Sequence, residues 1–288
     1  QSFNRFGAKV VVVEMLPRLM ANEDSDVSSF IEQKLKEEGI EILTDHRAVE
    51  FRGKVLVCNN KQKEITIPFD KILIAVGRKA NIKGFDPLKI VLRKNGTVDA
   101  NPWLQTNYPN IYVCGDVTGP YQLTHAAAHQ AWYCAVNALF SPLKKFRVDY
   151  GVIPWCTYTD PEIASVGINE NMAKQKDISY EITRYGIDDL DRAITDSDDY
   201  GFVKVLTVPG KDKILGATVV GVNAGELITE FVNAMKNNYG LNRILGTIHT
   251  YPTFSEANKY AAGVWKKKHV SRKALQYLQK FHNWRRRA

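Results

Sequence analysis

Cysteine is scarce in this sequence, and no two cysteines lie at a spacing typical of a metal site or a local redox motif. The chain has four cysteines in 288 residues, with no C-x-x-C and no paired Cys/His pattern. Neither a disulfide framework nor a zinc site is therefore supported. We expect reduced thiols and no bound metal. The four residues are Cys58, Cys114, Cys134 and Cys156.

Long apolar runs are also lacking. No run approaches the roughly 20 residues that cross a bilayer, and the first residues do not show the basic, apolar and small-residue order of a secretory signal. The composition, 44% hydrophobic and 24% charged, is that of an ordinary globular protein. The length suffices for about two domains with a sizeable core. We expect a soluble, cytoplasmic protein.

Acidic residues are missing from the last part of the chain. From Val264 onward there are nine Lys or Arg residues and no Asp or Glu, so this segment has a charge of +9. The whole chain has a net charge of +8, so the preceding residues carry about −1. Its apolar residues recur at helical spacing, which predicts an amphipathic helix with a cationic face. Packing on the protein itself and peripheral adhesion to an anionic membrane surface both stay open. No reading motif supports a nucleic-acid partner. The apolar positions are Val270, Ala274, Leu275, Tyr277, Leu278, Phe281 and Trp284.

Helices and strands alternate in the first part of the chain. The opening predicts the last turns of a helix stopped by Gly7, then a short strand over residues 9–13 that ends in Glu14. An amphipathic helix follows from Asp24 to Glu38. Strands are predicted over "EILTD", "AVEF", "KVLVC", "EITIP" and the continuous apolar run "KILIAVG". The pattern indicates a parallel-sheet α/β unit with a small antiparallel meander.

The second part of the chain has a different pattern. A polar, turn-rich stretch leads to a predicted buried strand, "NIYVCGD", and a helix starts near Thr124. The segment "SPLKK" looks like a hinge. Longer strands then alternate with helices, which predicts a separate α+β domain. The predicted strands are "VIPWCTYT", "SYEITRYGI", "GFVKVLTV" and "KILGATVVGV", and one of the helices is "AGELITEFVNAMKNN".

Two acidic residues follow predicted strands. Glu14 could accept hydrogen bonds from both hydroxyls of an adenosine ribose, and its charge would disfavour a 2′-phosphate. Asp116 could bind a polyol hydroxyl, while the N–H groups at the start of the next helix, Thr124 and His125, could face a group that becomes anionic, such as the N1 and C2 carbonyl edge of a reduced flavin. The alternatives are a charged strand end and a turn Asp before an ordinary helix.

A third stretch, "HTYPTFSEANKYAAG", places Tyr251 directly before a proline and two residues after His249. One interpretation is a helix start, with Thr253 as N-cap and Glu256 completing a capping box.

Taken together, these stretches resemble the pyridine nucleotide-disulfide oxidoreductases, the flavoprotein family of dihydrolipoamide dehydrogenase, glutathione reductase and mercuric reductase. The resemblance runs to about Val264, and it depends on the order and spacing of the motifs. They are Glu14, "ILIAVGRKAN", "IYVCGDVTGPYQLTHAAAHQA", "IPWCTYTDPEIASVG", "GFVKVLTVPGKDKILGATVVG" and "HTYPTFSEANKYAAG".

The resemblance implies four regions and two cofactors, FAD and NAD. Residues 1–81 are similar to the later part of the NAD domain, 82–148 to a central segment that returns to the FAD domain, and 149–264 to the interface domain of a homodimer; 265–288 form the basic tail. In the NAD part, Glu14 would bind the ribose, Ala48 would lie near the adenine, and Gly77 would let the backbone approach the cofactor. In the FAD part, Gly115 and Asp116 would lie at the ribityl chain, and the backbone of Gln122, Leu123, Thr124 and His125 would face the isoalloxazine.

The resemblance also gives the third stretch a role. Most disulfide-reducing members have a histidine directly before this proline. The histidine enters the active site of the partner subunit, where it carries a proton to a thiol, and it is held by the glutamate five residues further on. Here Glu256 is present, Tyr251 takes the place of the histidine, and His249 would point to the same side of an extended segment. A phenol, with an ordinary pKa near 10, carries protons less readily at neutral pH than an imidazole.

Mercuric reductases are similar at this point, with a Tyr-x-Thr-x-x-Glu pattern that "YPTFSE" satisfies. No cysteine follows Cys156, so we expect no delivery of Hg(II) by C-terminal thiols. The family's Cys-x4-Cys pair and FAD-binding glycine motif would precede this sequence, so we expect the C-terminal part of a longer polypeptide. The parent is expected to reduce a disulfide, a metal or another small-molecule acceptor. The alternative is a non-catalytic dimerisation fragment.

Overall fold

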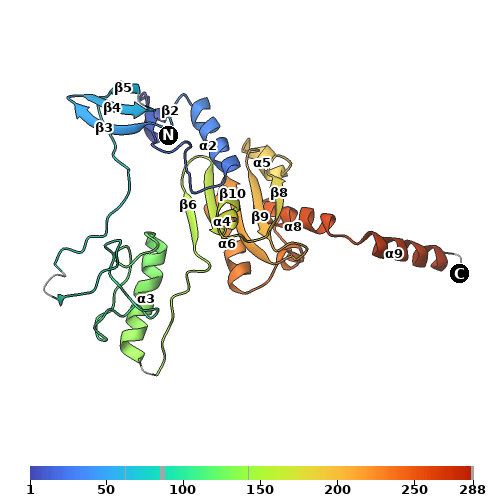
Figure 1. Cartoon of the computed structure of the whole chain (residues 1–288). Coiled ribbons are helices and arrows are strands. Elements are labelled where there is room, and N and C mark those ends of the chain that lie inside the picture. Colours follow the sequence, from blue (N-terminus) through green and yellow to red (C-terminus); the bar gives the residue numbers. More distant parts are fainter. Residues whose placement is uncertain (62, 85–87, 142, 287–288) are drawn as a thin grey trace. The chain divides into compact units, whose positions relative to one another are not determined.

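The computed structural model describes residues 1–61, 63–84, 88–141 and 143–286. The chain forms two compact units (Figure 1). Unit 1 comprises Gln1–Asp70 and Pro154–Ala288, and unit 2 comprises Lys71–Ile153. The domain boundaries predicted after residues 81, 148 and 264 divide the chain differently, and they stay predictions.

The N-terminal part of unit 1 has the predicted elements. Gly7, at φ +91°, follows the short first helix. Strands β1 and β2 pair in parallel, with Val12 opposite Ile42, and β3, β4 and β5 form the antiparallel meander. The elements are α1 (Ser2–Arg5), β1 (Val11–Val13), α2 (Ser25–Glu37), β2 (Glu41–Leu43), β3 (Arg47–Arg52), β4 (Val55–Asn60) and β5 (Lys63–Pro68).

The C-terminal part of unit 1 is the predicted α+β domain. Its five strands form one antiparallel sheet in the order β6-β7-β10-β9-β8. The strands are β6 (Pro154–Thr157), β7 (Glu162–Gly167), β8 (Glu181–Gly186), β9 (Phe202–Thr207) and β10 (Ile214–Gly221). The helices are α4 (Glu170–Gln175), α5 (Asp191–Asp196), α6 (Ala224–Lys236), α7 (Leu241–Leu245) and α8 (Glu256–Lys268).

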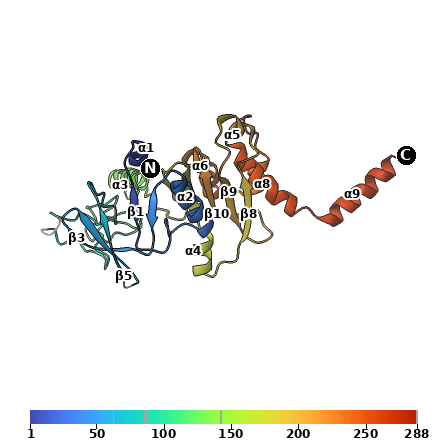
Figure 2. The ribbon, with the colours of Figure 1, turned by 90° about the horizontal axis from the view of Figure 1, so that it is seen from above.

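Helix α2 packs on this sheet and joins the two parts of unit 1 (Figure 2). Its apolar face, including Val27 and Ile31, shares a buried cluster with Phe202 and Val220 of the sheet. Strand β9 contacts α8, and β10 contacts α6. Every residue of β9 is buried because both faces of the sheet are covered.

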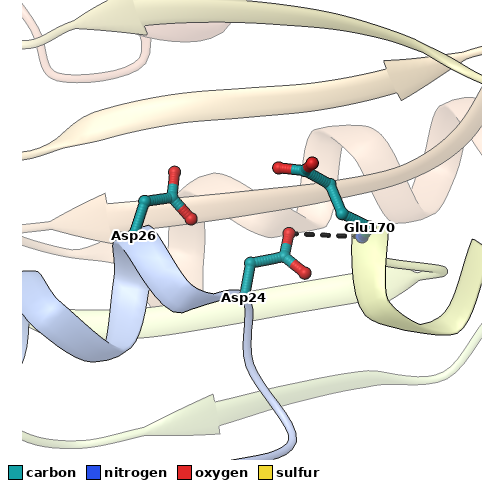
Figure 3. Close-up of side chains that lie close together, drawn as sticks. All are labelled: Asp24, Asp26 and Glu170. Atoms are coloured by element: carbon teal, nitrogen blue, oxygen red, sulfur yellow. Dashed lines mark hydrogen bonds between the residues drawn. The ribbon is translucent and has the colours of Figure 1, made fainter. Parts of the chain in front are cut away.

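A buried ammonium group reinforces this junction. Lys204, 1% exposed, places its Nζ 2.8 Å from Asp24, 2.7 Å from Asp26 and 3.1 Å from Glu170. Figure 3 shows the three carboxylates, which come from the start of α2 and the start of α4. Their oxygen atoms lie within 4.8 Å of one another, close enough for a metal site. The Lys204 ammonium supplies the positive charge instead.

The same cluster ties two helix starts together. The Asp24 carboxylate accepts the backbone N–H groups of Glu170, at 3.2 Å, and Asn171, at 3.1 Å, at the N-terminus of α4. Burial acts to lower the pKa of Lys204, but its bonds to Asp24 and Asp26 outweigh that effect, and the pKa is raised. The stabilisation is therefore fully present at neutral pH and is lost only as the pH rises through the raised value.

Unit 2 contains one long helix, α3 (Thr124–Phe140), and its described residues form only isolated bridges between extended segments. The strand predicted over "KILIAVG" is wrong: Leu73 is 79% and Val76 91% exposed, without strand pairing. A buried parallel strand needs paired neighbours and covering layers, and the described part of the chain supplies neither here. The strand predicted over "NIYVCGD" is reduced to one bridge, between Tyr112 and Gln105.

Two buried amides on α3 hold the loops of unit 2. Gln130 and Asn137 are seven residues apart, so they lie on one face of the helix, and they are 2% and 0% exposed. Asn137 donates to the carbonyls of Trp103, at 3.0 Å, and Phe146, at 2.9 Å, and accepts the Phe146 N–H at 2.6 Å. Side chain-to-backbone bonds thus take the place of a strand ladder.

The basic tail forms a helix, as predicted, and this helix is separate from α8, which ends at Lys268. Helix α9 (Arg272–Arg285) begins at Ser271, whose Oγ accepts the Ala274 N–H at 3.3 Å. None of the residues of α9 is buried. Among the described residues, no helix combines the length and apolar character that crossing a bilayer requires.

The Lys204 cluster yields a stability prediction. Lys204→Met should lower the free energy of unfolding by about 3–5 kcal/mol at neutral pH, because it leaves three close carboxylates without their cation. Lys174→Met is the matched control: Lys174 is 66% exposed and lies 3.8 Å from Glu170, so its loss should cost at most about 1 kcal/mol. Urea unfolding followed by tryptophan fluorescence measures both. Equal losses for the two variants would contradict the assignment.

Candidate functional site

The Asp116 turn is fixed from the side of α3. Gly115 has φ +80°, a conformation that favours glycine, and a Cβ there would lie 3.4 Å from the Cβ of Ala127. The Gly115 N–H donates to Oε1 of buried Gln130 at 2.7 Å. The Thr118 N–H then bonds to the Gly115 carbonyl at 3.0 Å, which closes the turn around Asp116.

The other side of the turn is held by backbone and arginine contacts. The Val98 N–H donates to the Val117 carbonyl at 2.7 Å, and Arg93 reaches the Thr118 carbonyl at 3.4 Å. The Asp116 side chain is half-buried. No described residue donates a hydrogen bond to its carboxylate, so the oxygens can accept from a hydroxyl.

Helix α3 begins close to this turn, and its N-cap side chain does not cap it. Leu123 is the N-cap residue and provides no side-chain hydrogen bond. The first intrahelical bond runs from the Ala127 N–H to the Leu123 carbonyl at 2.9 Å. Thr124 and His125 precede that bond and are exposed, so the dipole of a 17-residue helix is directed toward this end.

Arg78 links the "AVGR" motif to the segment before α3. Its Nη1 donates to the Gln122 carbonyl at 2.9 Å. Gly77 has φ +128°, and no atom lies within 4 Å of the position that a Cβ would take. The backbone at Gly77 is therefore open to a ligand. In unit 2 the structure thus brings Gly77 and Arg78 to the same loop region as Gln122.

Glu14 and Ala48 belong to unit 1. Glu14 directly follows β1, and its N–H bonds to the Leu43 carbonyl at 2.9 Å, which extends the parallel pairing. Its Oε1 accepts the Leu16 N–H at 2.8 Å, so the carboxylate is oriented at the strand end with acceptor capacity remaining. Ala48 lies exposed on β3, opposite Cys58 of β4.

Tyr251 is oriented by a carboxylate that the sequence interpretation did not include. Its hydroxyl donates to Oδ2 of Asp191 at 2.7 Å, and the residue is 67% exposed. The hydrogen bond to Asp191 raises the pKa of Tyr251 above its ordinary value. The raised pKa means that the phenol holds its proton more tightly than a free tyrosine does.

Glu256 does not bond to Tyr251. Its Oε2 accepts the Thr253 N–H at 3.2 Å, and its Oε1 accepts the Tyr260 hydroxyl at 3.3 Å. Helix α8 starts at Glu256 with Ser255 as the N-cap residue. The hydrogen bond from the Thr253 N–H to the Glu256 side chain, predicted as part of a capping box, is formed. The prediction of Thr253 as the N-cap residue is wrong, because the N-cap is Ser255, two residues later.

His249 and Tyr251 have separate partners. The His249 ring places Nε2 3.0 Å from Glu230 and Nδ1 3.1 Å from the Thr247 carbonyl. Its side chain is 6% exposed. Both ring nitrogens of His249 contact groups other than Tyr251. The structure therefore does not bring His249 and Tyr251 together, although an extended segment would have pointed both side chains to the same side.

Three residues were missed by sequence reasoning. Arg78 stands inside a quoted motif, and Gln130 is a polar residue in an otherwise apolar helix, so both carried a signal. Asp191 is 60 residues from Tyr251, and nothing in the local sequence connects the two.

Comparison with protein families gives two matches. Residues 1–131 match a model described as pyridine nucleotide-disulphide oxidoreductase, and residues 153–262 match the dimerisation domain of the same family.

Relatives in this family are also found by sequence. A dihydrolipoyl dehydrogenase from Chlamydia muridarum is 31% identical over 260 residues, which is 88% of this chain and 54% of the relative. One from Mycobacterium leprae is 33% identical over 258 residues, 88% of this chain and 55% of the relative. The chain thus spans a little over half the length of these relatives.

Solved structures share the fold. The HOCl-induced flavoprotein disulfide reductase RclA from Escherichia coli superposes with a TM-score of 0.80 at 22% identity, over 91% of this chain and 60% of RclA. LpdA from Mycobacterium tuberculosis gives 0.80 at 23% identity, over 94% of this chain and 58% of LpdA. With its two halves matched in order by models of one family, the chain belongs to the pyridine nucleotide-disulfide oxidoreductases.

Proposed function

We propose that the complete protein is an FAD-dependent, NADH-oxidising oxidoreductase that transfers electrons to a disulfide, a metal ion or another small acceptor. The observation that supports this proposal best is the hydrogen-bonded Asp116 turn beside the start of α3, whose N-cap side chain makes no hydrogen bond. When bound, FAD would supply the chemistry that accepts a hydride from NADH and passes electrons on. The runner-up is a dimerisation fragment without catalysis.

The residues of unit 2 fit the flavin. The Asp116 carboxylate can accept a ribityl hydroxyl, because no described residue occupies it. The backbone from Gln122 to His125 supplies N–H groups and a positive helix end, which stabilise negative charge on a reduced ring. Gly115 makes the turn possible, and Gln130 keeps it at α3.

The residues at the end of β1 fit NAD. The Glu14 carboxylate is oriented by the Leu16 N–H and can accept from ribose hydroxyls. Its negative charge disfavours a 2′-phosphate, so NADH is the proposed donor. Ala48, without a bulky side chain on an exposed strand, leaves space for an adenine.

A homodimer is the proposed assembly, because the chain carries the family's dimerisation domain. In such a dimer, Tyr251 of one protomer would serve the site of its partner. The Asp191 bond fixes the direction of the phenol, and Tyr251 would donate its proton to the reduced acceptor. Any dithiol step is proposed only for the complete protein, since no Cys-x4-Cys pair occurs in these 288 residues.

Tyr251→Phe tests the proton donor. In the complete protein, the variant should slow acceptor reduction by about 10²-fold or more, the range typical of a lost general acid, while NADH should reduce the flavin at the wild-type rate. Anaerobic stopped-flow absorbance separates the two half-reactions. Unchanged acceptor turnover would reject the role of Tyr251.

Asp191→Asn provides the matched positioning variant. It removes the carboxylate that raises the pKa of Tyr251 and keeps a group of the same shape. The alkaline limb of the acceptor-reduction profile should then move to lower pH, because the phenol loses its proton more readily. An unshifted profile would show that Asp191 acts only as a structural contact.

Glu14→Ala tests the choice of nucleotide. The variant should weaken the binding of NADH roughly tenfold more than the binding of NADPH. The reason is that a charge-assisted hydrogen bond, worth about 1.5–3 kcal/mol, is lost for NADH alone. The two KM values for flavin reduction measure the effect. An equal loss of affinity for both nucleotides would show that Glu14 does not bind the ribose.

A further inference from the structure

Helix α9 has two faces of opposite character. With 3.6 residues per turn, its apolar side chains fall on one half of the helix, and three of its cations, Arg272, Lys273 and Lys280, fall on the other. The fourth cation, Arg285 in the last turn, falls on the apolar half, with its guanidinium 5.9 Å from the centroid of the Phe281 ring. The apolar half consists of Ala274, Leu275, Tyr277, Leu278, Phe281 and Trp284.

This apolar half is not covered by the described part of the chain. Tyr277 is 72% and Trp284 67% exposed, and no residue of α9 is buried. The ring contacts of Phe281 stay within the helix, at centroid distances of 5.6 Å to His282 and 6.1 Å to Trp284. Packing on the protein's own surface, one of the two arrangements open from sequence, is therefore not formed among the described residues.

The charge of the C-terminal segment indicates which kind of surface it can bind. From Val264 to Arg286 the chain has eight Lys or Arg residues and no acid, whereas the preceding 263 residues carry about −1. Lys268 and His269, which precede α9, contact Glu181 of unit 1 at 3.1 Å and 3.0 Å, but among the described residues no acidic side chain pairs with a cation of α9. A second copy of α9 would bring like charges together. An anionic lipid surface supplies both a negative charge and an apolar layer.

We propose that α9 binds the surface of an anionic phospholipid bilayer. Its 14 residues span about 21 Å, too short to cross the roughly 30 Å apolar core, so the helix lies in the plane of the interface. Leu278 and Phe281 enter the acyl boundary. Trp284 and Tyr277 lie at headgroup level, and the lysines of the other half contact phosphates. The proposal is independent of the proposed catalytic function.

Vesicle sedimentation of the full chain tests the proposal. The protein should bind phosphatidylcholine vesicles that contain about one third phosphatidylglycerol, bind pure phosphatidylcholine far more weakly, and lose affinity as salt increases. The double variant Lys273→Gln/Lys280→Gln should bind about 30-fold more weakly, at about 1 kcal/mol per basic residue. Phe281→Glu should also weaken binding strongly.

The matched control is Lys63→Gln/Lys211→Gln, which removes the same charge from exposed positions in unit 1, outside α9. It should keep wild-type affinity, and all variants should unfold at the wild-type temperature because they alter exposed residues. Three outcomes would overturn the proposal: no binding to anionic vesicles, an equal loss in the control, or an α9-dependent oligomer that forms without vesicles and does not bind them.

Discussion

Two amide side chains on one face of α3 determine whether the candidate flavin site exists. Unit 2 has almost no strand pairing among its described residues, so its loops cannot take their shape from a sheet. Gln130 binds the Gly115 N–H, and Asn137 fixes the segments at Trp103 and Phe146. Buried amides are costly unless their hydrogen bonds are made. The loops and the helix therefore require each other, and Asp116 is presented as a result.

Unit 1 uses a charged cluster for a similar purpose. Lys204 of β9 draws together Asp24, Asp26 and Glu170, so the start of α2 is fixed to the sheet of the dimerisation domain. Helix α2 lies between β1 and β2 in the chain, and Glu14 follows β1. The cluster thus connects the part of the chain that carries the proposed nucleotide site with the domain that contains Asp191 of α5 and the Tyr251 loop. The arrangement adds directional contacts to the hydrophobic packing, because the buried Lys204 ammonium contacts three carboxylates at once.

Much of unit 1 could be predicted from sequence, since alternating patterns, Gly7 and the α2 periodicity encode local structure. Unit 2 could be predicted less well. The apolar run at residues 71–77 has the composition of a buried strand, but strand formation depends on partners that composition does not contain. At the site, Asp116, Gly115 and the start of α3 could be found because they follow one another in the chain. The Tyr251 partner could not: the family resemblance pointed to Glu256, five residues on, whereas the phenol bonds to Asp191 of α5, 60 residues away in the sequence.

The central claim is that the Asp116 turn, held by Gln130, binds a flavin. The most direct measurement is the visible absorbance of the complete protein after gel filtration, which reports the fraction of sites that retain the cofactor. The account predicts a yellow wild-type protein, and colour largely lost in Asp116→Ala and Gln130→Leu but kept in Gln33→Leu, a change at an exposed glutamine of α2. A colourless wild-type protein, or equal flavin content in all variants, would contradict it.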